Sequence, residues 1–458
     1  MNRDNLDFGS GKIGSLFKAM FFPTLVGMLF NSALNVCDGM FVGHGVGSDG
    51  LAAINIVAPL FLLCAGIGLM FGIGASVIGS IRLSENNVSA ARQIMTQAFA
   101  SGAIIFAVVI AVSLLFSREV LFALGCSESL ESLATDYLLW LLPGLVFFYF
   151  QCVGMMLIRI DGSPRYAMNV QIVCAVLNIF LDWYMVFPLG MGIKGASIAT
   201  SLSCIAGGFM VIAYFLFFSN KLKFCRMRLS LASLKESVRN TAYMVKIGLA
   251  TFIAELSIGI MMVTGNYMFL SYLGESGVAA FSVGCYLFPL IFSISNSVAQ
   301  SSQPIISFNY GRSQWERVRK TLYMALRTAC ICGAIISAGM WAGASLLSGI
   351  FLPSTEEAYG LAVTGLPLLG LCALPFAINI SFIGYYQSCE QATRSIIYML
   401  LRGVVFMVPG FILLPQLSGV GGLWLAIPLS ELMAAAIIVS TYFSRDNDNS
   451  LHYLKRNL

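Results

Sequence analysis

Long apolar stretches separated by short polar segments make up most of the chain. Each stretch is long enough to cross a bilayer as an α-helix, which takes about 20 residues. Six stretches lie near residues 16–43, 50–81, 90–116, 131–157, 165–187 and 192–218, and six more near 242–272, 277–308, 321–351, 358–388, 395–415 and 420–443. The pattern predicts an all-α integral membrane protein with twelve transmembrane helices.

Short motifs of the first half return in the same order in the second half. The matching pairs are Met40-Phe41 with Met268-Phe269, Asp161 and Arg165 with Glu390 and Arg394, and Gly192 and Gly195 with Gly419 and Gly422. We therefore expect two related six-helix lobes, residues 1–218 and 242–458, the second ending in a cytoplasmic tail. Duplicated membrane domains of this kind bind substrate between their halves and alternate its access to the two sides. The repeat thus indicates a transporter.

Composition and charge support a membrane location. Hydrophobic residues form 58% of the chain and charged residues 10%, too few charges for an ordinary soluble surface. Nearly all of the 26 lysines and arginines fall on the side that carries both termini, while Arg118 and Lys194 lie on the other. The positive-inside rule then predicts cytoplasmic N- and C-termini in a multi-pass protein of the plasma (inner) membrane.

The longest polar stretch, residues 219–241, is basic and joins the two predicted lobes as a cytoplasmic linker. Such a segment forms either an amphipathic helix on anionic lipid or a plain solvated connector. The sequence alone does not decide between the two.

Carboxylates within the apolar stretches are candidates for function, because ionisable groups are unfavourable in lipid. Asp38 and Asp182 fall roughly 8 and 9 Å from the outer surface at 1.5 Å per helical residue, and their half offers no deep basic partner. Asn178 shares a helix face with Asp182, and Thr200 falls roughly 12 Å deep on the next helix. These four oxygen-bearing side chains predict a site for Na⁺ or H⁺. The alternative is that they only hydrogen-bond neighbouring helices.

Two further acidic residues lie deep in the second half. Glu255 is a candidate contact for a cationic substrate or a coupling proton, or else a carboxylate paired to another helix. Glu431 and Arg402 reach similar depths from opposite surfaces, so we expect a structural ion pair between them.

Signatures of catalysis and of cofactor binding are weak. The two histidines, His44 and His452, fall in a loop and in the tail, and the cysteines lie mostly within apolar stretches as packing residues. No nucleotide-binding motif precedes a suitable helix. We therefore expect neither an enzyme nor a bound cofactor, metal or nucleic acid, and transport would use an ion gradient.

Three segments resemble the multidrug and toxic compound extrusion (MATE) family. They are the run from Gln303 to Gly311 followed by basic residues to Lys320, the segment from Arg159 to Met168, and the segment from Asp38 to Gly43. The resemblance covers nearly the whole chain. It implies a V-shaped arrangement of two six-helix bundles and export of amphipathic or cationic drugs in exchange for Na⁺ or H⁺, by a monomer in the lipid bilayer.

The same resemblance assigns site residues. It places the cation site of the N-terminal lobe at Asp38, Asn178, Asp182 and Thr200, and a helix-seven carboxylate at Glu255. Some family members carry an aspartate in helix ten, whereas this chain has none there, so no second cation site is expected.

Other functions stay open from the residues alone. A flippase or exporter of lipid-linked oligosaccharide or a metabolite shares the two-lobe plan, although its cavity usually carries basic residues. A membrane enzyme or a passive channel are further alternatives, and dependence of flux on a counter-ion gradient separates an antiporter from a channel.

Overall fold

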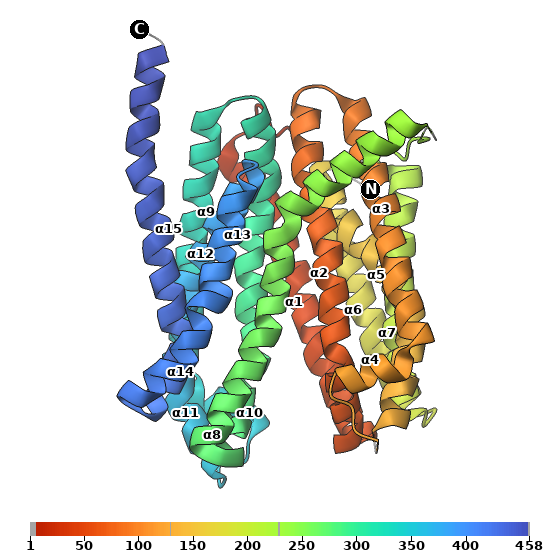
Figure 1. Ribbon diagram of the computed structural model, residues 1–458, viewed down its shortest axis with the longest axis vertical. Helices are drawn as coiled ribbons and strands as arrows, with labels where there is room; N and C mark the ends of the chain where they lie inside the picture. Colours follow the sequence, from red (N-terminus) through yellow and green to blue (C-terminus); the bar gives the residue numbers. More distant parts are fainter. Residues whose placement is uncertain (1–5, 129, 228–229, 457–458) are drawn as a thin grey trace. The chain divides into compact units, whose positions relative to one another are not determined.

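The computed structural model describes residues 6–128, 130–227 and 230–456, and helices account for nearly all regular structure there (Figure 1). The first part of the chain contains α1 (Ile13–Gly45), α2 (Ser48–Ser84), α3 (Val88–Leu115), α4 (Ser117–Ala123), α5 (Glu131–Ile160), α6 (Pro164–Val186), α7 (Gly192–Ala213) and the π-helix η1 (Tyr214–Phe218). The rest contains α8 (Leu231–Gly311), α9 (Trp315–Ala342), α10 (Ala344–Phe351), α11 (Glu357–Gly370), α12 (Ala373–Ser388), α13 (Ala392–Leu400), the π-helix η2 (Leu401–Val405), α14 (Met407–Ser418) and α15 (Val420–Arg456).

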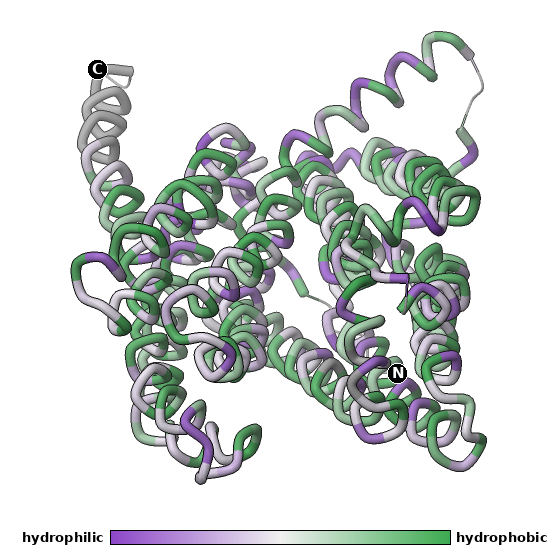
Figure 2. The backbone as a smooth tube through the Cα atoms, turned by 60° about the horizontal axis from the view of Figure 1, so that its bottom comes forward, coloured by the Kyte–Doolittle hydropathy of each residue, from purple (hydrophilic) through white to green (hydrophobic). Residues whose placement is uncertain are grey.

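Ten helices of the described residues are long and apolar enough to cross a membrane, and α11 with α12 forms a further span bent by 42°. Helix α8 has 81 residues and breaks at Gly274, whose φ of 64° favours glycine. The break coincides with the predicted polar gap between 272 and 277. With the two parts of α8 counted separately, the described residues supply the twelve spans predicted. Figure 2 shows that hydrophobic residues dominate most of these helices.

The chain forms two compact units whose borders do not follow the midpoint of the sequence. Unit 1 comprises residues 1–256, 300–321 and 387–392, and unit 2 comprises residues 257–299, 322–386 and 393–458. Within unit 1, α5 packs against α2 and α7, and α1 packs against α6. Within unit 2, α15 packs against α11 and α14.

Small residues permit close backbone contact between two helices of unit 1. A Cβ atom added to Gly74 of α2 would lie 2.1 Å from the carbonyl oxygen of Met244 on α8. Conversely, a Cβ atom on Gly248 would lie 1.9 Å from the carbonyl oxygen of Met70. Close backbone packing through small residues is common between membrane helices, where lipid removes most of the hydrophobic drive for association. These glycines hold the first part of α8 against α2.

Candidate functional site

Three helices of unit 1 bring the predicted cation-site residues together. Asp38 comes from α1, Asn178 and Asp182 from one face of α6, and Thr200 from α7. Asn178 and Asp182 are fully buried, and Asp38 is half-buried. The packing of α1 against α6 and of α6 against α7 allows these side chains to meet.

The two carboxyl groups are close neighbours. The side chains of Asp38 and Asp182 lie within hydrogen-bonding distance of each other. Two carboxylates at such a distance repel unless a proton or a cation lies with them. One oxygen of each group, Oδ1, is buried and has no hydrogen-bond partner among the described residues. These oxygens are therefore available as acceptors or ligands.

Asn178 bridges the pair to α7. With its amide nitrogen oriented toward Asp182, Asn178 donates to Asp182 Oδ2 at 3.0 Å, and its oxygen accepts from the backbone N–H of Thr200 at 3.3 Å. The Thr200 hydroxyl donates to the carbonyl of Ala196 at 3.1 Å, the usual bond of a threonine within a helix. The carboxylate, amide and hydroxyl oxygens gathered here are the ligand types that hard cations prefer.

Sequence reasoning missed Tyr137 of α5. Its buried side chain lies close to the Thr200 side chain and within electrostatic reach of Asp38 and Asp182. The Tyr137 carbonyl also accepts from the Ser197 hydroxyl at 2.5 Å, which ties α5 to α7. A tyrosine near the end of an apolar stretch is typical of the interfacial aromatic belt. The sequence offered one signal for Tyr137, which is that it falls at a depth in the membrane similar to that of Asp38 and Asp182.

Glu255 lies on α8, apart from this cluster. It is 7% exposed and packs with Phe252 against Gly66 of α2. The interactions of the Asp38–Asp182 pair do not include it. Its predicted role in substrate binding or coupling therefore stays a prediction.

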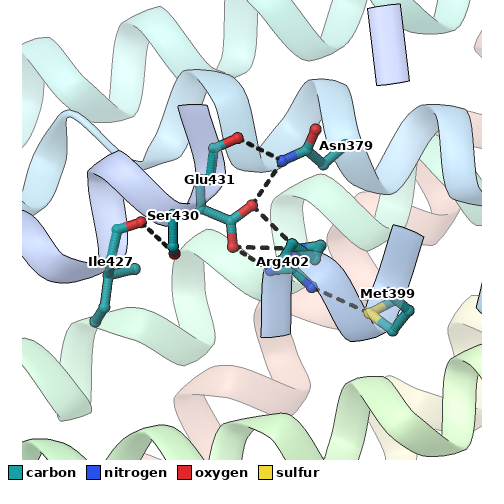
Figure 3. A network of polar contacts seen from close by, with 6 residues as sticks. All are labelled: Asn379, Met399, Arg402, Ile427, Ser430 and Glu431. Atoms are coloured by element: carbon teal, nitrogen blue, oxygen red, sulfur yellow. Dashed lines mark hydrogen bonds and ion pairs between the residues drawn. The ribbon is translucent and has the colours of Figure 1, made fainter. Parts of the chain in front are cut away.

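In unit 2, Arg402 of η2 and Glu431 of α15 form a buried ion pair (Figure 3). Arg402 Nη2 lies 2.6 Å from Glu431 Oε1, and Arg402 Nε donates to both carboxylate oxygens at 3.0 Å. Asn379 of α12 donates to Glu431 Oε2 at 2.8 Å. The guanidinium also lies 4.3 Å from the centre of the Phe376 ring. The acidic charge is thus neutralised by the protein itself.

Within the described residues, no group of three or more histidine, cysteine, aspartate or glutamate side chains is arranged to hold a metal ion. Among the described residues, none of the twelve cysteines forms a disulfide. A monovalent cation or a proton at the Asp38–Asp182 pair does not require such a group, because two carboxylates with neutral oxygens are sufficient.

Comparisons with known proteins agree with this architecture. A model of the MatE family matches residues 23–184 and 248–412, one match in each half of the chain. The FAD transporter of Shewanella oneidensis is 25% identical over 436 residues, covering 93% of both chains. The multidrug export protein MepA of Staphylococcus aureus is 23% identical over 436 residues, covering 94% of both chains.

Solved structures show the same fold. An outward-facing multidrug resistance MATE family transporter has a TM-score of 0.87 at 22% identity, covering 97% of both chains. A MOP superfamily transporter from Pyrococcus furiosus has a TM-score of 0.86 at 22% identity, covering 95% of this chain and 96% of that one. The predicted fold class, an all-α protein of two repeated lobes, is confirmed.

Proposed function

Because the chain belongs to the MatE family, which includes multidrug efflux transporters, we propose that it exports amphipathic and cationic compounds in exchange for Na⁺ or H⁺. The observation that carries the proposal is the buried pair of Asp38 and Asp182, each with an oxygen that lacks a partner among the described residues. A carboxylate pair without a basic neighbour binds a cation or a proton readily.

In the proposed cycle, the coupling ion enters the Asp38–Asp182 pair from outside and favours drug release and return to the inward-facing state. A ligand shifts such an equilibrium only through its different affinities for the two states. Each positive charge that moves inward across 100 mV supplies about 2.3 kcal/mol. Asp38, Asn178, Asp182 and Thr200 hold the ion, and the Tyr137 side chain lies close to Thr200.

The proposal includes the location and assembly of the protein. The segregation of basic residues supports cytoplasmic termini in the plasma (inner) membrane. We assign the chain as a monomer that needs no organic cofactor and performs no catalysis.

A fluorescent organic cation loaded into proteoliposomes tests the function. Imposed Na⁺ and pH gradients should each be applied to wild type and Asp38→Asn, and the proposal expects gradient-driven efflux that the substitution abolishes. Efflux that ignores both gradients would identify a passive pore and overturn the proposal.

A second cargo class is favoured by one relative, the FAD transporter of Shewanella oneidensis. FAD is an anionic dinucleotide, so it should be loaded in a parallel set of vesicles. Export of FAD and not of the organic cation would replace the proposed cargo with an anionic metabolite. Whether that export is coupled to an ion would then follow from its dependence on the imposed Na⁺ and pH gradients.

A further inference from the structure

The start of α8 carries an exposed amphipathic face that the transport cycle does not use. We infer that residues 231–246, here called the amphipathic segment, bind anionic phospholipid at the membrane surface. The inference rests on the membrane topology and not on the proposed transport. Figure 1 shows this bright green segment running obliquely to α2 and α3 of unit 1.

One face of the segment is fixed to unit 1. Gln97 of α3, which is 2% exposed, donates to the Ser237 hydroxyl at 2.9 Å and accepts from the Asn240 amide at 2.9 Å. Met244 is fully buried two turns further along on the same side. These contacts set the rotation of the helix and therefore determine which residues face away from the protein.

The opposite face is apolar and uncovered. Leu231 is 81% exposed, and Leu234 and Val238 are each 62% exposed. Their spacing of three and four residues places them in one stripe along the helix. Leucine and valine exposed in this way favour contact with acyl chains, and the helix continues directly into the apolar part of α8.

A basic stripe adjoins the apolar one. Lys235, Arg239 and Lys246 are exposed and recur at helical spacing, so they lie together beside the leucines. Glu236 is the one acidic residue of the segment. An apolar stripe next to a basic stripe fits the boundary between acyl chains and anionic headgroups, where each basic side chain favours binding about fivefold. Figure 2 shows the hydrophilic and hydrophobic residues interleaved along this helix.

The chain before the segment is also bonded to unit 1. Asp161 accepts hydrogen bonds from the backbone N–H groups of Asn220, Lys221 and Leu222 at 2.8–3.0 Å, and from the Tyr214 hydroxyl at 2.8 Å. The Ser230 side chain then caps the helix by accepting from the Ser233 N–H at 3.2 Å. Residues 220–222 are therefore fixed to unit 1 shortly before the amphipathic segment begins, and the segment itself begins as a capped helix.

The test uses Leu234→Trp as a reporter in vesicles that contain acyl-brominated phosphatidylglycerol or acyl-brominated phosphatidylcholine at equal mole fraction. Bromine quenches nearby tryptophan, and the signal of the native tryptophans is subtracted using the parent protein. We expect about twofold stronger quenching by the phosphatidylglycerol. Adding Lys235→Gln, Arg239→Gln and Lys246→Gln should remove the preference while the apolar stripe keeps the reporter in reach of both lipids.

A matched control removes charge elsewhere on the basic side. Arg319→Gln with Lys320→Gln, on α9, should leave the preference unchanged, because these residues lie outside the segment. Quenching no stronger than that of the parent, or equal quenching by both lipids before the glutamine substitutions, would overturn the inference. Loss of the preference in the α9 control would overturn it as well, because the charge effect would then be general. Lipid preference and efflux are measured separately, so failure of the proposed transport function leaves this result interpretable.

Discussion

In unit 1, fully buried Asp182 lies beside a second carboxyl group, Asp38, whereas in unit 2 the equally buried Glu431 lies against the guanidinium of Arg402. Both are acidic groups inside a membrane protein, where an isolated charge is unfavourable. In unit 2, the guanidinium of Arg402 neutralises the Glu431 carboxylate. We propose that in unit 1 a mobile cation or a proton supplies the positive charge, so that this site would respond to an ion gradient.

The repeat explains how the two halves diverged. Since Met40-Phe41 recurs as Met268-Phe269, the position of Asp38 corresponds to Asn266 in the second half. Asn266 lies at a cavity of about 450 Å³, and the one carboxylate in its lining is that of Glu275. The second half therefore has an amide in place of one acidic residue and an internal ion pair elsewhere.

The largest expected effect comes from breaking the internal pair. Arg402→Leu leaves Glu431 buried without a cation, and removal of one partner of a buried pair costs about 3–5 kcal/mol. Denaturant unfolding in detergent micelles should show a loss of that size.

The matched control replaces both partners. Arg402→Met with Glu431→Leu should regain most of the lost stability, because an apolar pair of similar volume leaves no buried charge. Equal destabilisation by the single and the double substitution would show that packing, and not charge, dominates at this position.

Na⁺ should stabilise unit 1 by a smaller amount. A ligand that binds only the folded state stabilises it by about 1.4 kcal/mol at ten times its dissociation constant. We expect thermal unfolding of wild type to shift upward in Na⁺ relative to choline at equal ionic strength, and Asp38→Asn to remove the shift. A shift that survives Asp38→Asn would place the ion elsewhere, whereas no shift in wild type would select H⁺ as the coupling ion.

The smallest effect on stability is expected when an acidic residue replaces Asn266, the counterpart of Asp38 in the second half. Asn266→Asp should change the free energy of unfolding by less than about 1 kcal/mol, because the side chain is only half-buried and lines a cavity. Combined with Asp38→Asn, it should not restore the Na⁺ shift. Recovery of that shift would mean that the introduced carboxylate, with Glu275 in the same cavity, can hold the ion, so that the Asp38–Asp182 pair is not required.

The membrane spans could be predicted from the sequence because each span ends where apolar residues give way to polar ones. The polar gap near Gly274 predicted the break there, where a non-helical backbone conformation at Gly274 divides α8 into two helices. The predicted stretch 358–388 is α11 and α12, bent by 42° at their junction. A bend of this kind depends on packing, which hydropathy does not record.

The site was only partly predictable, because helix packing determines which side chains meet and hydropathy does not record packing. Depth along each helix follows from residue counting, so the level of Asp38 and Asp182 and the contact of Arg402 with Glu431 could be estimated from sequence. The rotation of α5, which brings the Tyr137 side chain close to Thr200, depends on how α5 packs against α7. Apolar stretches without a polar face carry little information about rotation.

The most direct test compares the two buried acidic sites in one transport assay. Efflux of a fluorescent organic cation from proteoliposomes under an imposed Na⁺ or pH gradient should be measured for Asp182→Asn and for the double substitution Arg402→Met with Glu431→Leu. The account predicts that Asp182→Asn abolishes gradient-driven efflux and that the double substitution retains it. Retained coupling in Asp182→Asn together with lost coupling in the double variant would contradict the assignment of the ion site to unit 1.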